Sequence, residues 1–151
     1  MTSIPAPSVT APVVLGYAPM DEVHAEFQAL LGRAASCPDE DFPLQLDAVV
    51  AHLREHFEAE DRWMAETDFP PGDCHRDEHA AVLRSADEVQ LLHPDSRLVV
   101  GRAFVRELAH WFPGHADYLD SALAAWMCRR AHGGKPVVLL RRVPTSAAEQ
   151  A

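Results

Sequence analysis

The positions of its prolines restrict the fold of this 151-residue chain more than any other feature of the sequence. Proline lacks an N–H donor and clashes with the preceding helical turn, so it seldom lies inside a helix. Eleven of the twelve prolines fall outside four proline-poor segments, at about 20–37, 44–69, 72–93 and 95–132. Only Pro113 lies inside a segment. The chain is therefore expected to form four long elements joined by short connections.

Apolar residues recur at helical spacing in these segments. They follow steps of three or four, whereas a strand would show alternation. The second segment has Leu46, Val49, Leu53 and Phe57, the third has Val82, Ala86 and Val89, and the fourth has Phe104, Leu108 and Trp111. This pattern predicts an all-α fold, an antiparallel up-and-down four-helix bundle over residues 20–132. An N-terminal arm, 1–19, would precede the bundle, and a short C-terminal tail, 133–151, would follow it.

Composition excludes several classes of partner. Asp and Glu outnumber Lys and Arg by 23 to 13, so the net charge of -10 predicts no binding to nucleic acid. No stretch approaches the roughly 18 apolar residues that membrane insertion requires. The three cysteines are widely separated, which argues against a disulfide framework, and the N-terminal stretch does not resemble a signal peptide. We therefore expect a cytoplasmic protein.

Polar residues interrupt the inward stripes of the predicted helices. Two pairs, His56 with Glu60 and His75 with His79, are spaced i, i+4, which places each pair on one helix face. Burying imidazoles and carboxylates without partners costs roughly 1 to 3 kcal/mol per neutral group, whereas a metal centre would satisfy them together. Five imidazoles and two carboxylates fit two octahedral first-row ions better than one tetrahedral zinc ion or a calcium ion. The candidate ligands are His24, His56, Glu60, His75, His79, His115 and Asp120.

The spacing of His115 and Asp120 does not fit this scheme on its own. Five residues of an ideal α-helix rotate by about 500°, or about 140° past a full turn. The two side chains would then not share a face.

The same residues resemble the motifs of the hemerythrin family, specifically its bacterial single-domain members. The matching stretches span residues 20–120 and are Met20–His24, His56–Asp61 with Met64, His75-x-x-x-His79 and Trp111-Phe112-x-x-His115-x-x-x-x-Asp120. The resemblance implies a bundle with two iron ions, one held by His75, His79 and His115 and the other by His24 and His56. Glu60 and Asp120 would bridge the ions together with an oxo or hydroxo group. Dioxygen would bind at the iron held by His24 and His56.

The fourth segment departs from the family pattern beside the expected oxygen pocket, which we assign to Trp111, Phe112 and Ala116. Family members usually have a large aliphatic residue where this chain has Ala116. Pro113 is expected to kink the helix next to a ligand. Together these differences predict a more open pocket and faster autoxidation.

The remaining candidates receive simpler interpretations. His52 has the spacing to coordinate with His56, but we expect it not to be a ligand. His93, His110 and His132 are expected to face solvent. The apolar and basic stretch 137–142 is expected to dock on the bundle.

The leading functional hypothesis is a non-enzymatic protein that binds dioxygen reversibly for transport, storage or delivery to an oxygen-consuming enzyme. The alternatives are a di-iron oxidase, peroxidase or nitric oxide-reactive enzyme, and a sensor of oxygen or redox state. A ferritin-like ferroxidase would need more inward carboxylates.

Overall fold

The described part of the chain, residues 11–133 of a computed structural model, is built from helices and contains no strand. Residues 1–10 of the predicted arm and 134–151 of the predicted tail lie outside it. The elements are α1 (Ala18–Ser36), α2 (Phe42–Glu66), α3 (Gly72–Gln90), α4 (Pro94–His115), a π-helical turn η1 (Ala116–Asp120) and α5 (Ser121–Ala131).

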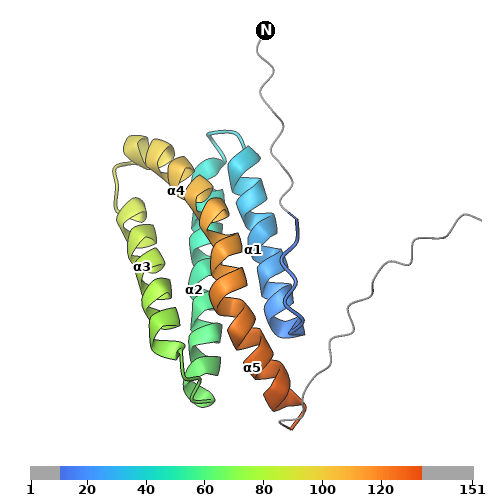
Figure 1. Ribbon diagram of the computed structural model, residues 1–151. Coiled ribbons are helices and arrows are strands. Elements are labelled where there is room, and N and C mark those ends of the chain that lie inside the picture. Colours follow the sequence, from blue (N-terminus) through green and yellow to red (C-terminus); the bar gives the residue numbers. More distant parts are fainter. Residues whose placement is uncertain (1–10, 134–151) are drawn as a thin grey trace, which may run out of the picture.

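These helices form the predicted four-helix bundle (Figure 1). Helix α1 packs against α2, α2 against α3 and α3 against α4, and α4 returns to pack against α1. Short connections join these neighbours, so the topology is up-and-down. The run from α4 through η1 to α5 supplies the fourth long element.

Prolines lie in the first turn of three helices. Pro19, Pro43 and Pro94 occupy the first or second positions of α1, α2 and α4. The first N–H groups of a helix have no intrahelical acceptor, so proline loses nothing there. The three helices therefore begin one or two residues earlier than the proline-poor segments suggested.

The fourth element differs from the prediction of one continuous α-helix. Helix α4 continues past Pro113 to His115. The hydrogen bonding then changes to the i→i+5 type in η1, where the N–H of Ser121 donates to Ala116 O. The irregularity therefore lies one turn after the proline and is a change of helical register.

A polar layer divides the bundle core into two apolar clusters. The larger cluster includes Phe27, Leu53 and Phe112, and the smaller one consists of Met20, Met64, Phe69, Leu123 and Ala124. Along α1, α2 and the α4–η1–α5 run, buried His, Glu and Asp side chains lie between members of the two clusters. No helix in the described range is long and apolar enough to cross a membrane.

Candidate metal centre

All four long elements contribute to the polar layer, and each candidate ligand is at most 3% exposed. The contributors are His24 from α1, His56 and Glu60 from α2, His75 and His79 from α3, His115 from α4 and Asp120 from η1. The structure thus brings together all seven residues that the sequence singled out.

The π-helical turn explains how His115 and Asp120 meet. Residues five apart are about one turn apart when hydrogen bonds run i→i+5, so the two side chains can face the same point. His115 Nε2 lies 3.0 Å from Asp120 Oδ1. The expectation that the two residues do not share a face assumed an ideal α-helix, and η1 removes that assumption.

The two oxygens of Asp120 face different histidines. Oδ1 lies 2.9 Å from His75 Nε2 and 3.0 Å from His115 Nε2. Oδ2 lies 3.1 Å from His24 Nε2, which belongs to the opposite side of the layer. A carboxylate with its oxygens divided in this way has the arrangement of a bridge between two metal positions.

Glu60 divides its oxygens in the same way. Oε1 lies 2.8 Å from His56 Nε2 and 3.4 Å from His24 Nε2. Oε2 lies 3.4 Å from His75 Nε2 and 3.3 Å from His79 Nε2. Both carboxylates therefore separate a pair, His24 and His56, from the other three histidines.

Two overlapping groups of ligand atoms result. Glu60, His75, His79, His115 and Asp120 form one, and His24, His56, Glu60 and Asp120 form the other. Within each group the ligand atoms lie within 4.8 Å of one another. Two ligand atoms bound at right angles to an ion about 2.1 Å from each would lie about 3 Å apart. The 3.3 Å between the Nε2 atoms of His79 and His115 is close to this separation.

Several of these close approaches lack hydrogen-bond geometry. His24 Nε2, His75 Nε2 and both oxygens of Asp120 are buried without a hydrogen-bond partner, although His24 Nε2 lies 3.1 Å from Oδ2 and His75 Nε2 lies 2.9 Å from Oδ1. An unpaired buried polar group is costly, so such groups normally find partners. The atoms point toward shared positions more than toward each other, which is the arrangement that metal ions would satisfy.

The charges of the histidines and carboxylates influence each other strongly. Burial lowers the pKa of His24 and His75, but the nearby carboxylates Asp120 and Glu60 outweigh burial and raise each pKa to about 9. Burial raises the pKa of Glu60 and Asp120, but the surrounding histidines outweigh this effect and lower both values below the usual range. Both carboxylates are thus charged at neutral pH, which suits them to bind a cation.

Two further carboxylates hold the outer edges of the histidine rings. Asp61 Oδ1 lies 2.8 Å from His79 Nδ1. Glu78 Oε1 lies 2.8 Å from His115 Nδ1 and also accepts a hydrogen bond of 3.0 Å from Trp111 Nε1. Such partners fix the ring orientation and raise the basicity of a ligating histidine.

Sequence reasoning assigned no role to either carboxylate. Asp61 and Glu78 are about one-third exposed and look like surface charges when only helical spacing is considered. The available signal was that Asp61 directly follows Glu60 and Glu78 directly precedes His79 in the sequence.

Aromatic rings enclose the layer. Phe112 lies edge-on to His24, with ring centroids 5.0 Å apart, and Phe27 contacts both Phe112 and His56. On the three-histidine side, Phe57 stacks on His79 at 4.0 Å and Trp111 on His115 at 4.3 Å. The two-histidine side is therefore covered by apolar rings.

The residues expected to form the oxygen pocket do not all lie on the same side of the centre. Phe112 lies against the two-histidine side, whereas Trp111 covers His115 on the three-histidine side. Ala116 has no exposed surface and belongs to the larger apolar cluster. Neighbouring core residues enclose Ala116, and the more open pocket stays a prediction.

The other histidines lie outside both groups. His52 stacks on Phe27 with ring centroids 5.7 Å apart, and its Nε2 lies 3.4 Å from Glu26. His93 precedes α4, while His110 and His132 are exposed.

Comparison with known proteins agrees with this geometry. A family model described as the hemerythrin HHE cation binding domain matches residues 15–127, which include all seven candidate ligands. The chain belongs to the hemerythrin family. The bacteriohemerythrin of Ralstonia nicotianae (strain ATCC BAA-1114 / GMI1000) is 41% identical over 116 residues, which cover 77% of this chain and 85% of that protein. No solved structure gives a significant match. The four-helix bundle and the cluster of candidate metal ligands are both consistent with membership of the hemerythrin family.

Proposed function

We propose that the chain holds two iron ions, bridged by an oxo or hydroxo group, and binds dioxygen reversibly at this centre. The observation that carries the proposal is that each carboxylate directs one oxygen toward the side of His24 and His56 and the other toward the side of the remaining three histidines. One ion would be held by His75, His79 and His115, and the second by His24 and His56. Both ions would be bridged by Glu60 and Asp120.

The donor set supports iron over several other metals. Two positions rich in imidazole do not suit calcium or magnesium, which prefer oxygen ligands, and seven ligands exceed the needs of one tetrahedral zinc ion. The position held by His24 and His56 has one histidine fewer than the other. It would keep a coordination place free for a small molecule.

Two ferrous ions would supply one electron each to dioxygen. The residues around the position held by His24 and His56 suit an uncharged diatomic ligand. The Phe27 and Phe112 rings lie against His56 and His24, where they exclude water and offer an apolar surface. On the other side, Glu78 and Asp61 hold His115 and His79 in orientation, which favours a centre that keeps its geometry through repeated cycles.

Transport, storage or delivery of dioxygen in the cytoplasm is the role that we propose, with an oxygen-consuming enzyme as a candidate recipient. The test is to load the protein with iron anaerobically, measure the iron content and record absorption spectra through cycles of oxygen and argon. We expect about two irons per chain and bands that appear and disappear reversibly. His56→Ala should lose one iron and the reversible bands, whereas His110→Ala, at an exposed position, should keep both.

Irreversible oxidation with release of hydrogen peroxide in the first cycle would instead support an oxidase. An iron content well below two per chain would refute the proposed centre.

A further inference from the structure

An apolar groove on the outside of the bundle lies between α3 and α4 and encloses about 680 Å³. Its walls include Val82 and Val89 from α3, Leu92 from the connection that follows α3, and Val100, Phe104 and Leu108 from α4. Trp111 lines the end that lies nearer to η1. The neighbouring Leu91 and Val99 are 86% and 71% exposed, so apolar surface continues beyond the groove.

Each wall of the groove also carries one exposed glutamate, Glu88 on α3 and Glu107 on α4. Within residues 11–133, neither lies within ion-pair distance of a basic side chain, since neither takes part in the ion pairs found there. An occupant that matches the groove would therefore combine aliphatic side chains with positive charge.

The C-terminal part of the chain has this composition. Residues 121–148 contain no Asp or Glu but hold five of the thirteen Lys and Arg residues of the chain. Within this stretch, the segment Val137–Arg142 has four consecutive aliphatic residues followed by two arginines. The remainder of the chain is strongly acidic, so the two parts attract each other.

The segment is too close to the end of α5 to reach the groove of its own chain. Trp111 precedes Gly133 by 22 residues, which in a nearly continuous helical run amounts to about 33 Å. Seven residues after Gly133 extend at most about 24 Å, so Leu140 cannot reach even the nearer end of the groove.

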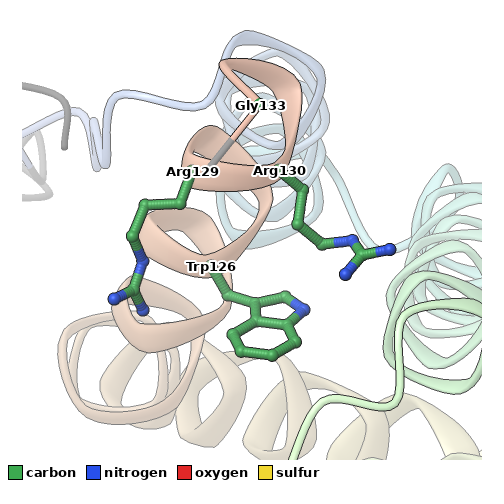
Figure 2. Close-up of a pocket in the computed structure, with 4 residues that line it drawn as sticks. All are labelled: Trp126, Arg129, Arg130 and Gly133. Atoms are coloured by element: carbon green, nitrogen blue, oxygen red, sulfur yellow. The ribbon is translucent and has the colours of Figure 1, made fainter. Parts of the chain in front are cut away.

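The hollow beside the end of α5 does not suit the segment either. It encloses about 420 Å³ and is lined by Trp126, Arg129, Arg130 and Gly133 (Figure 2). Arg129 and Arg130 lie on either side of the Trp126 ring, and their guanidinium groups would repel the arginines of the segment.

We propose that segment Val137–Arg142 of one copy of the chain docks in the α3–α4 groove of a second copy. The dimensions agree: from Val100 to Trp111 the α4 wall is about 17 Å long, and the six residues span about 17 Å when extended. Consecutive side chains of an extended segment point to opposite sides, so Arg141 and Arg142 can approach the glutamates on both walls. Reciprocal exchange between two copies closes the assembly as a symmetric dimer.

Sedimentation equilibrium of the full-length protein tests the proposal. We expect a dimer for the unmodified chain and a monomer for Leu139→Asp/Leu140→Asp, which replaces two of the four aliphatic side chains of the segment with charged ones and changes no residue of the bundle. The double reversal Glu88→Arg/Glu107→Arg should raise the dimer Kd by about tenfold or more through loss of the ion pairs. A matched reversal at two exposed acidic positions on α1 and α2, Glu22→Arg/Glu58→Arg, should leave the Kd within about threefold of the original.

Combining Glu88→Arg/Glu107→Arg with Arg141→Glu/Arg142→Glu exchanges the charges and should restore the dimer. A monomeric unmodified chain, a dimer that survives Leu139→Asp/Leu140→Asp, or charge exchange without recovery would each overturn the proposal. Circular dichroism identifies any variant that has not folded. The measurements use mass alone, so their outcome is separate from that of the iron and oxygen experiment.

Discussion

Replacement of Glu78 is the sharpest test of how the protein holds the three-histidine side of the centre. One oxygen of Glu78 accepts hydrogen bonds from both His115 Nδ1 and Trp111 Nε1, and the two rings stack on each other. Glu78→Ala removes both hydrogen bonds. We expect the affinity of one of the two metal positions to fall, because His115 is then free to rotate away from it.

The structure sets the size of the effect. Loss of such an outer partner costs roughly 10- to 100-fold in metal affinity, or about 1.4 to 2.7 kcal/mol. The Glu78 side chain is 38% exposed, so water can replace part of what is lost. We therefore expect about a tenfold decrease for Glu78→Ala, at the lower end of that range. The amide oxygen of Glu78→Gln can still accept both N–H groups, so only the charge is lost and the decrease should be about threefold.

The assay is an anaerobic titration with ferrous or cobaltous ions against a chromophoric chelator, which resolves the two binding steps. Asp77→Asn is the matched control, since it removes one negative charge at an exposed position of α3 next to Glu78. It should leave both steps unchanged. If Glu78→Ala weakened both steps equally, or if Asp77→Asn had the same effect, orientation of His115 by Glu78 would not be the cause.

Three further predictions concern the bundle and the pocket. Gly101→Ala should destabilise the metal-free protein by up to about 2 kcal/mol in urea. Overpacking costs about 1 to 3 kcal/mol, and the better helix propensity of Ala offsets about 1 kcal/mol of this cost. Its new Cβ would meet the buried Phe42 ring at 2.8 Å, whereas Gly32→Ala meets nothing within 4 Å and should stabilise; equal effects would contradict this. Ala116→Ile should slow autoxidation by placing a large aliphatic side chain beside the expected oxygen pocket, and an unchanged rate in stopped-flow spectra would rule this out. Metal-free protein should lose stability in urea between pH 6.5 and about 9, because histidines with a pKa raised from 6.5 to about 9 stabilise the fold fully only below pH 6.5; equal stability at pH 6 and 9.5 would argue against those values.

The helices and the ligand set could be predicted because each leaves a local signal. Prolines bounded the four segments, and helical spacing placed His75 and His79 on the inward face together with the apolar residues that follow them. A buried imidazole needs a partner, so several of them on inward faces indicated a shared site. These inferences depend only on the geometry of a regular helix.

The outer carboxylates could not be predicted in this way. Asp61 and Glu78 lie partly in solvent and contact histidines on other helices, 18 and 37 residues away in the sequence. In a chain with 23 acidic residues, no spacing rule distinguishes them from surface charges. Their role depends on which helices are neighbours and at what height, which only the packed bundle defines.

The turn η1 shows why the bridge was harder to predict than the other ligands. In a regular α-helix that continued α4, Asp120 would point about 140° away from His115. The i→i+5 turn rotates Asp120 into the core, where it has no exposed surface, together with Leu123 and Ala124 of the smaller apolar cluster. The same register change therefore places the bridging carboxylate in the centre and also buries Leu123 and Ala124 in the smaller apolar cluster. Because a π-helical turn is unfavourable in isolation, two independent gains from one turn give a physical reason for its presence. A gap of five between two inward residues is then evidence for such a turn, and it does not argue against a shared site.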